Sequence, residues 1–216
     1  MLGNITENSF LCVIITQTTP AFILLHKSCI KFSYGKARLY PGHFHHYKFF
    51  SPEECAGLIQ KSEAIGYEEA MVDVGGGEQR MIKGVRNNER VLYKDEIYAA
   101  FIWERLKAFA PQGNFDRTAC GLNELFRFYK YSPGQRFKMH KDGSFVRDLS
   151  EASQYTFMIY LNEGYSGGET VFASGEVIRP QAGTALVFYH PLRHEGTLLT
   201  DGVKYVLRTD IMYRGI

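Results

Sequence analysis

The fold is decided in the stretch Tyr155-Thr-Phe-Met-Ile-Tyr160-Leu-Asn-Glu-Gly-Tyr-Ser-Gly-Gly-Glu-Thr170-Val-Phe172. Its first seven residues are mostly aromatic or β-branched, a composition that favours a strand. Gly167 and Gly168 then break the apolar pattern and are typical of a tight connection between strands. The run Thr170–Phe172 follows at once, so we expect two consecutive strands here and no helix.

The same pattern recurs on both sides of this stretch. Short apolar and aromatic runs, each bounded by glycine or proline, lie at Leu125–Tyr131, Ala185–Tyr189 and Tyr205–Tyr213. Several short strands separated by turn residues are typical of an antiparallel sandwich or a jelly roll. The sequence therefore predicts an antiparallel β-domain in the C-terminal half of the chain.

Helices are expected before this β-domain. Ser51-Pro52-Glu53-Glu54 has serine at the N-cap, proline at the first helical position and glutamate where it completes a capping box. We predict a helix from there to about Ile65, ended by Gly66. A second helix is predicted from Asp95 to Phe109.

Composition excludes several classes of protein. The chain has 216 residues, of which 45% are hydrophobic and 22% charged, an ordinary globular balance that excludes a disordered tail or a collagen. The formal net charge is only +2. We therefore expect neither nucleic acid nor an anionic membrane as a partner. A small anionic ligand held by one or two cations is still compatible with this charge.

The N-terminal part and the cysteines bear on location. The four cysteines form no C-x-x-C pair, and scattered thiols favour a reducing compartment, so we expect a cytoplasmic protein. The longest apolar run, Phe10–Ile15, is far shorter than the ~20 residues of a membrane helix. A cleaved signal peptide is the alternative for this part. We predict that residues 1–33 are an extension of unclear role and that residues 34–120 form a helical support region.

A glycine-rich basic loop lies between the two predicted helices. Its residues 74–90 include Gly75-Gly76-Gly77 but lack the lysine and helix start of a phosphate-binding loop. We interpret it as a surface loop, with a lid over an active site as the alternative. The basic residues of the loop indicate a solvated face first and an acidic substrate second. They are Arg80, Lys83, Arg86 and Arg90.

Three residues have the chemistry of a metal site. His140 and Asp142 are two residues apart, and on a strand such side chains share one face. His194 is expected at the end of a neighbouring strand. Two histidines and one carboxylate form the facial triad of non-haem Fe(II) oxygenases, which leaves three metal positions open.

Other histidines are interpreted differently. The H-x-H-H pattern of His43, His45 and His46 lies among aromatic residues without an acidic neighbour, and it favours a half-buried strand over a metal site. His190 belongs to no motif, and we expect it on a turn or at the surface.

A cation is expected near the triad. Lys204 opens a predicted strand, and Arg208 lies on the same face by the period of two. A buried cation is costly without an anion, so either residue suits an anionic co-substrate. From spacing we favour Lys204. Thr156 and Tyr160 share the corresponding face of their own strand and would add hydroxyl groups.

Taken together, these motifs resemble the 2-oxoglutarate- and Fe(II)-dependent dioxygenases of the prolyl 4-hydroxylase type. The resemblance covers about residues 122–213. It rests on the motifs in their order: Tyr131-Ser-Pro-Gly-Gln-Arg-Phe-Lys-Met-His140-Lys-Asp142, Tyr155-Thr-Phe-Met-Ile-Tyr160-Leu-Asn162, Gly167-Gly168-Glu169-Thr170-Val-Phe172, Pro180-x-x-Gly183 with Ala185–Phe188, His194-Glu-Gly196 and Lys204-Tyr205.

The resemblance implies a fold and a set of residue roles. The fold is α+β, with a double-stranded β-helix, or jelly roll, in residues 121–216 and supporting helices before it. His140, Asp142 and His194 would hold Fe(II). The co-substrate 2-oxoglutarate would chelate the iron and place its 5-carboxylate at Lys204. Its further contacts would come from Tyr160, Tyr131, Arg208 and Thr156.

The implied reaction uses O2 and 2-oxoglutarate, releases succinate and CO2, and hydroxylates an unactivated C–H bond. Ascorbate is the reductant expected for this family. The favoured substrate is an amino-acid residue in a protein or peptide. Phe137, Ala173 and Tyr205 depart from the prolyl hydroxylase pattern and put prolyl specificity in doubt. The alternatives are a free amino acid, a small metabolite or an alkylated nucleobase, and a non-catalytic β-fold binding module.

Overall fold

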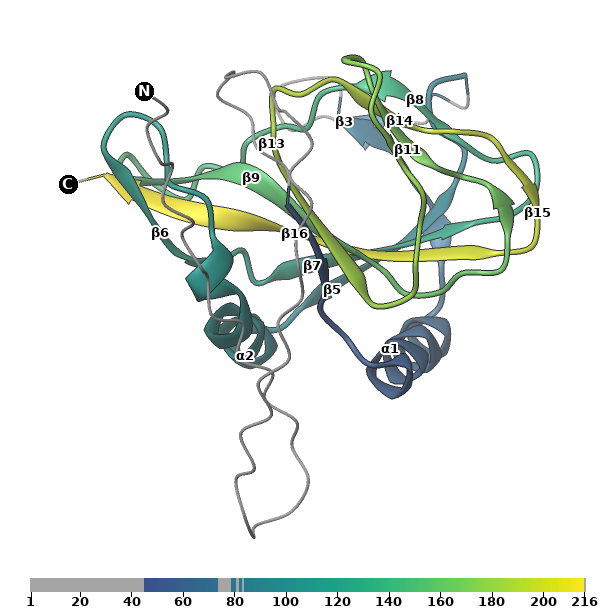
Figure 1. The fold of residues 1–216 in the computed structure, drawn as a ribbon, viewed down its shortest axis with the longest axis horizontal. Helices are drawn as coiled ribbons and strands as arrows, with labels where there is room; N and C mark the ends of the chain where they lie inside the picture. Colours follow the sequence, from purple (N-terminus) through teal and green to yellow (C-terminus); the bar gives the residue numbers. More distant parts are fainter. Residues whose placement is uncertain (1–44, 74–78, 81, 83, 216) are drawn as a thin grey trace, which may run out of the picture. The chain divides into compact units, whose positions relative to one another are not determined.

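The computed structural model describes residues 45–73, 79–80, 82 and 84–215. In this part of the chain, two antiparallel sheets form a β-sandwich, and two helices cover one outer face of the larger sheet (Figure 1). The predicted extension 1–33 and His43 lie outside these residues, as do several residues of the loop 74–90.

The larger sheet has the strand order β1-β13-β9-β16-β7-β5-β2, with β6 also paired to β16. The smaller sheet has the order β12-β11-β14-β8, and β10 with β15 and β3 with β4 form two-stranded ribbons. The strands have the following bounds: β1 His45–Lys48, β2 Glu68–Glu69, β3 Val72–Asp73, β4 Gln79–Arg80, β5 Glu89–Lys94, β6 Arg117–Leu122, β7 Leu125–Tyr131, β8 Phe137–His140, β9 Glu151–Tyr160, β10 Ser166–Gly167, β11 Thr170–Phe172, β12 Val177–Ile178, β13 Thr184–Tyr189, β14 His194–Gly196, β15 Leu199–Asp201 and β16 Lys204–Gly215.

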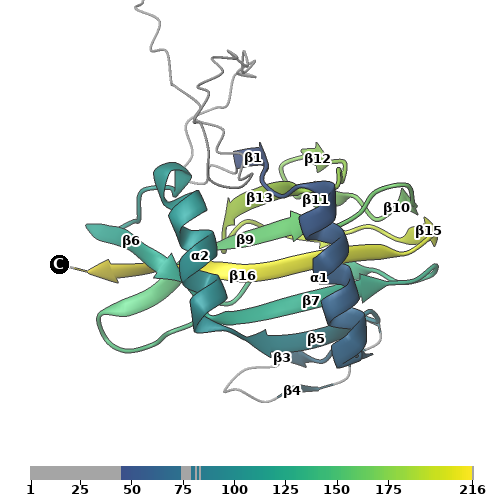
Figure 2. The same cartoon turned by 90° about the horizontal axis from the view of Figure 1, so that it is seen from below.

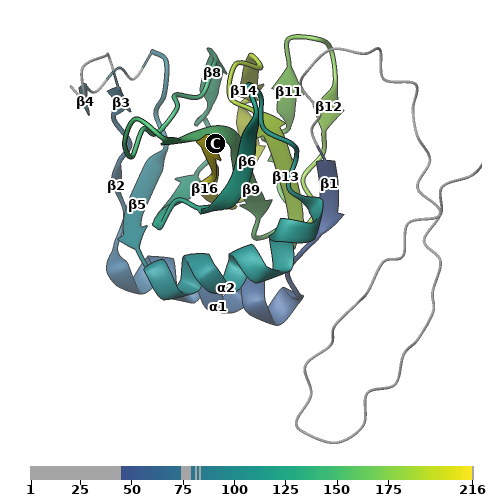
Figure 3. The same cartoon turned by 90° about the vertical axis from the view of Figure 1, so that its left-hand side faces the viewer.

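Both predicted helices are present. α1 (Pro52–Ile65) begins at the Ser51 cap, where the capping box with Glu54 is complete, and it is followed by Gly66 with φ 93°. α2 (Glu96–Leu106) is capped by the side chain of Asp95 and continues as the 3₁₀ turn η1 (Lys107–Phe109). Figures 2 and 3 show the two helices side by side across the strands β7, β9 and β16.

Alternation along the strands divides the core into two clusters. One lies between the large sheet and the helices and includes Phe126, Phe128, Phe157 and Ile159. The residues that alternate with them along the strands point the other way, into the sandwich. They form a second cluster that includes Tyr129, Tyr131, Met158, Tyr160 and Val206. The second face therefore carries hydroxyl and charged groups beside apolar ones, and it is the face on which the candidate site lies.

The predicted fold class is confirmed. Strands β7 and β11 have the predicted bounds, whereas β9 and β16 extend beyond the predicted runs. The architecture is a double-stranded β-helix with supporting helices in front of it in the sequence. Among the described residues, no helix is both long and apolar enough to cross a membrane.

Candidate active site

His140, Asp142 and His194 come together between the two sheets. Their ligand atoms all lie within 4.8 Å of one another. Nε2 of His140 is 3.6 Å from Oδ1 of Asp142, and Nε2 of His194 is 3.8 Å from Oδ2. Two nitrogens and a carboxylate that converge in this way could hold a divalent metal ion, and the set is the one preferred by non-haem Fe(II) sites.

Hydrogen bonds fix which ring nitrogens face the carboxylate. Nδ1 of His140 lies 2.7 Å from the carbonyl oxygen of Lys138, and Nδ1 of His194 lies 3.0 Å from that of Leu192. A carbonyl oxygen only accepts, so each Nδ1 carries the proton. Each Nε2 therefore presents a lone pair toward Asp142, as a metal ligand must.

The positions of the triad differ in detail from the sequence-based expectation. His140 is the last residue of β8, but Asp142 lies beyond the strand, where its N–H donates to the carbonyl oxygen of His190. His194 is paired with His140 and is the first residue of β14, not the last of a strand. The strand therefore ends before Asp142, and the shared face of a strand accounts for His140 but does not by itself extend to Asp142.

Neighbouring charges keep Asp142 deprotonated, and burial keeps His194 deprotonated. Burial alone would raise the pKa of Asp142, but Arg208 and the two histidines hold it well below its ordinary value. Burial lowers the pKa of His194 to about 4, partly opposed by Asp142. Both groups are therefore in the form that binds a metal at neutral pH.

A chain of hydrogen bonds lies behind Asp142. The hydroxyl of Thr156 donates to Oδ2 of Asp142 at 2.5 Å and lies 3.1 Å from Nδ1 of His190. Nε2 of His190 in turn lies 2.9 Å from the hydroxyl of Ser153. His190 lies on a turn, as expected, but it is buried and not at the surface, with 3% of the residue exposed. Its burial depends on partners from β9 and on the turn of Asp142, neither of which its local sequence shows.

The five residues predicted to bind 2-oxoglutarate fall into two groups. Lys204 lies near the rings of Tyr131 and Tyr160, with Nζ 5.2 Å and 5.5 Å from the ring centres. Thr156 and Arg208 instead contact Asp142. Nη1 of Arg208 lies 3.2 Å from Oδ1 of Asp142. The structure thus brings all five to one face of the sheet but places the two groups at different ends of it.

Lys204 and Arg208 have different electrostatic surroundings. Lys204 is 3% exposed and donates to the carbonyl oxygen of Gly168 at 2.5 Å. Within the described residues it forms no ion pair, and burial lowers its pKa to about 8, partly opposed by the charge of Glu169. Arg208 is paired with both Asp142 and Asp210, and although burial opposes them, these carboxylates raise its pKa.

Sequence analysis missed the ion pairs next to the triad. Asp210 accepts from Arg208 and also from Arg127, whose Nη1 is 3.1 Å from Oδ2. The signal that could have found them is the period of two. It places Asp210 on the face of Lys204 and Arg208.

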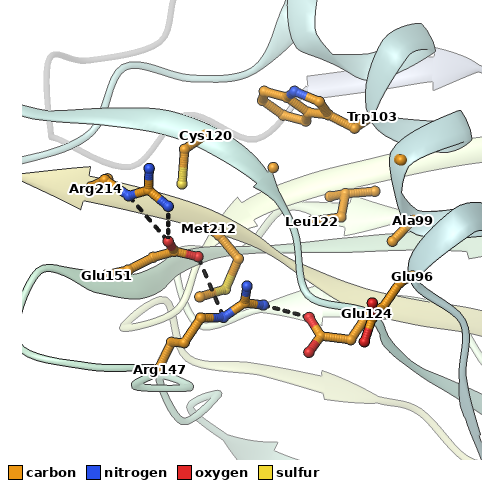
Figure 4. Close-up of a pocket in the computed structure, with 12 residues that line it drawn as sticks. Glu96, Ala99, Trp103, Cys120, Leu122, Glu124, Arg147, Glu151, Met212 and Arg214 are labelled. Atoms are coloured by element: carbon orange, nitrogen blue, oxygen red, sulfur yellow. Dashed lines mark hydrogen bonds and ion pairs between the residues drawn. The ribbon is translucent and has the colours of Figure 1, made fainter.

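A separate cleft of about 410 Å³ lies on the outer side, near α2 and β6 (Figure 4). Its ionic groups are already paired: Glu151 with Arg214 and Arg147, Arg147 also with Glu124, and Glu96 with Lys94 beside the cleft. None of the triad residues lines it. We therefore assign the chemistry to the triad and not to this cleft.

Comparison with known proteins agrees with this geometry. Residues 126–209 match the family model of the 2OG-Fe(II) oxygenase superfamily. That segment contains all three residues of the triad, Lys204 and Arg208. A comparison with curated proteins found no match.

Several solved structures share the fold. A viral collagen prolyl hydroxylase from Paramecium Bursaria Chlorella virus-1, in complex with 2OG, is 22% identical with a TM-score of 0.56, over 79% of this chain and 96% of that one. A Pseudomonas putida prolyl-4-hydroxylase is 20% identical with a TM-score of 0.58, over 80% and 92%. A Trichoplax adhaerens prolyl hydroxylase, in complex with a hypoxia inducible factor peptide, is 15% identical with a TM-score of 0.57, over 78% and 82%. These matches support a 2-oxoglutarate-dependent dioxygenase: residues 126–209 fit the 2OG-Fe(II) oxygenase superfamily, and the chain has the fold of the prolyl 4-hydroxylases.

Proposed function

We propose that His140, Asp142 and His194 hold Fe(II), and that the enzyme hydroxylates an amino-acid residue of a peptide or protein. The observation that supports the iron site is the pair of Nε2 lone pairs turned toward one deprotonated carboxylate. When bound, the iron supplies the activation of O2, coupled to conversion of 2-oxoglutarate to succinate and CO2.

We assign the 5-carboxylate of 2-oxoglutarate to Lys204. Lys204 is a buried cation without a carboxylate partner among the described residues, whereas Arg208 already has two. Burial deprives the Lys204 ammonium group of hydration, and a carboxylate bound there would compensate for this loss. Tyr131 and Tyr160 flank this position.

The residues between the two ends suit the rest of the co-substrate. Val206 lies between Lys204 and Arg208 on the same face, and it is paired with Tyr129 on β7 and Tyr160 on β9. This row would contact the methylene carbons. Thr156 and Arg208 then serve the triad by orienting Asp142, and not the distant carboxylate.

The peptide substrate is supported by the relatives and by access. The Trichoplax protein of the same fold is bound to a peptide fragment. In this chain the side chain of His140 is partly exposed while that of Asp142 is buried, so a substrate would reach the triad on the side of His140. We further propose that ascorbate sustains turnover, that the protein works in a reducing, cytoplasmic compartment, and that residues 121–216 are the catalytic unit.

The test is release of succinate from 2-oxoglutarate by the full chain loaded anaerobically with Fe(II), before and after O2 is admitted. We expect O2-dependent succinate from the wild type, none from His140→Ala, and wild-type behaviour from Lys141→Ala, an exposed neighbour between two of the ligands. Ascorbate is expected to prolong the release.

Binding provides a second readout. The anaerobic Fe(II) form is expected to give a visible charge-transfer band when 2-oxoglutarate is added, and His140→Ala is expected to give none. Absence of both the band and succinate in the wild type would contradict the proposed iron and 2-oxoglutarate sites.

A further inference from the structure

Positive charge gathers beside the triad on the inner face of the large sheet. The register of β7 and β16 puts Arg127 directly opposite Arg208. Like charges in this position destabilise a sheet unless an anion separates them. Asp210 does so, with Oδ2 3.1 Å from Nη1 of Arg127 and Oδ1 3.1 Å from Nη2 of Arg208.

A third guanidinium group, that of Arg86, has no such anion. The interpretation of the loop as a solvated face was wrong at this position, because Arg86 is 6% exposed. Its guanidinium lies 4.3 Å from the ring centre of Tyr129 and 4.6 Å from that of Phe137. Nε donates to Asn88 at 2.6 Å, but Nη2 is buried without a hydrogen-bond partner. No carboxylate of the described residues pairs with it.

Arg86 is linked to the triad through two aromatic rings. Phe137 is stacked on His140, with 3.5 Å between the ring centres. The hydroxyl of Tyr129 is hydrogen-bonded to both Arg86 and Arg208. Burial would raise the pKa of Tyr129, but the charges of Arg86, Arg208 and Arg127 lower it. The lowered pKa of a buried phenol indicates a strongly positive potential at this point.

The local charges do not balance. This part of the site has three guanidinium groups and two carboxylates: Arg127 and Arg208 pair with Asp142 and Asp210, and Arg86 lies on the rings of Tyr129 and Phe137. A divalent cation on Asp142 would compete with Arg208 for that carboxylate and add positive charge. The two negative charges of 2-oxoglutarate offset the two positive charges of the metal, and Lys204 adds one more positive charge. The site therefore stays positive when it is loaded.

Solvent reaches this cluster. The side chains of Arg208 and Arg127 are 15% and 20% exposed, beside the partly exposed His140. Nε of Arg208 is also without a hydrogen-bond partner. A guanidinium donates well-aligned hydrogen bonds to a carboxylate. Arg208 is paired through Nη1 and Nη2 but keeps Nε free, and Arg86 keeps Nη2 free, so these two N–H groups are suited to a carboxylate of the substrate.

We propose that Arg208 and Arg86 bind a carboxylate of the substrate beside the iron site, so that the enzyme oxidises an acidic peptide, one that carries aspartate or glutamate at or next to the hydroxylated residue. This proposal rests on the proposed function and specifies its substrate class. Arg208 touches the carboxylate from the side of Asp142, and Arg86 from the side of Phe137.

The first test needs no variant. Wild-type enzyme with Fe(II), 2-oxoglutarate and O2 is given pools of acetylated, amidated short peptides in which one position is fixed as Asp, Asn, Glu or Gln. Free aspartate, asparagine, glutamate and glutamine form a second arm. Succinate release above the substrate-free rate is measured, and mass spectrometry detects the added oxygen. The acidic peptide pools are expected to exceed their amide counterparts by about tenfold or more, as for a hydrogen-bonded charge pair.

Variants then locate the contact. Arg86→Gln is expected to raise the KM of the best acidic peptide by about 10- to 100-fold and to remove its advantage over the amide peptide. Its charge-transfer band and KM for 2-oxoglutarate are expected to match the wild type, which also shows that it folds. Arg105→Gln, on the helix side of the sheet and paired with Glu54, is the control and is expected to keep the acid preference.

The outcomes separate the two proposals. Suppose that the band and succinate appear, but the amide peptides raise succinate release as much as the acidic ones, or no peptide pool raises it. The acidic-peptide proposal is then wrong, and the proposed iron site stands. If only the free amino acids stimulate succinate release, the acidic-peptide proposal is also wrong, and the substrate is a small acid. If neither band nor succinate appears, the proposed function fails and this inference with it.

Discussion

Oγ1 of Thr156 lies 2.5 Å from Oδ2 of Asp142, and the same oxygen lies 3.1 Å from Nδ1 of His190. A threonine hydroxyl has one proton, which the charged carboxylate takes as a hydrogen bond, so Nδ1 of His190 must donate to Oγ1. Nε2 of His190 then accepts from Ser153, 2.9 Å away. The chain of donors thus runs in one direction and ends on the carboxylate of the triad.

Removing this hydroxyl is expected to loosen the metal site. Thr156→Val keeps the shape of the side chain but leaves Oδ2 of Asp142 without its donor. We expect Fe(II) affinity to fall by about 10- to 100-fold, the usual effect of losing a group that orients a ligand. Anaerobic titration with Fe(II), followed by the charge-transfer band, measures the change. Thr156→Ser retains the hydroxyl and is expected to bind as the wild type does; equal affinity in Thr156→Val would show that Asp142 needs no such support.

Lys204 is expected to reduce the stability of the ligand-free protein. Burial lowers its pKa from 10.5 to about 8, so holding the charge at neutral pH costs about 3 kcal/mol. Lys204→Met removes that cost and should raise the free energy of unfolding at pH 7 by about 1–3 kcal/mol, measured by urea denaturation without 2-oxoglutarate.

The order of stability is expected to reverse when 2-oxoglutarate and Fe(II) are saturating. The ligands then stabilise the wild type, whereas Lys204→Met has lost the partner of the 5-carboxylate. A wild type more stable than Lys204→Met without ligand would mean that Lys204 has an anionic partner in the free protein.

The same pKa predicts how 2-oxoglutarate binding depends on pH. Since the pKa of Lys204 in the folded protein is about 8, the ammonium group is lost above that pH. Binding should be nearly constant from pH 6.5 to 7.5 and, above the pKa, weaken by about tenfold per pH unit, because the neutral Lys204 amine must take up a proton before it can pair with the anion. Calorimetry at several pH values measures this. Lys204→Arg keeps its charge and is expected to show no such fall; a parallel loss in both proteins would point to a different group.

The sequence predicted most of the scaffold because its signals are local. The capping box at Ser51 and the alternation in β9 and β16 depend only on neighbouring residues. The triad residues were also found, since their types and order are distinctive. Their placement was not, because Asp142 lies beyond the end of β8 and is held by a hydrogen bond to the carbonyl oxygen of His190, 48 residues away in sequence.

The burial of His190 and Arg86 could not be predicted in the same way. His190 is buried by partners on β9, and Arg86 by the rings of Tyr129 and Phe137. Each contact joins segments at least 30 residues apart or on different strands, and neither residue lies in a periodic run. A charged residue in a glycine-rich loop looks solvated until the strands that cover it are known.

Glu151, beside the outer cleft, offers a test of charge burial away from the site (Figure 4). Its carboxylate is 5% exposed and accepts from Nη2 of Arg214 at 2.6 Å, with Nε of Arg147 3.5 Å away. Removing both cations in Arg147→Ala/Arg214→Ala leaves a buried carboxylate without a counter-charge, so we expect a loss of about 3–5 kcal/mol by urea denaturation.

Adding Glu151→Gln to that double variant is expected to recover much of the loss, because the amide carries no charge to bury. Glu151→Gln alone should cost only about 1 kcal/mol, since Arg214 is largely exposed and can be solvated by water. This asymmetry identifies burial of the carboxylate, and not the number of ion pairs, as the source of the instability. If the triple variant is as unstable as the double, the arginines act through packing of their side-chain stems instead.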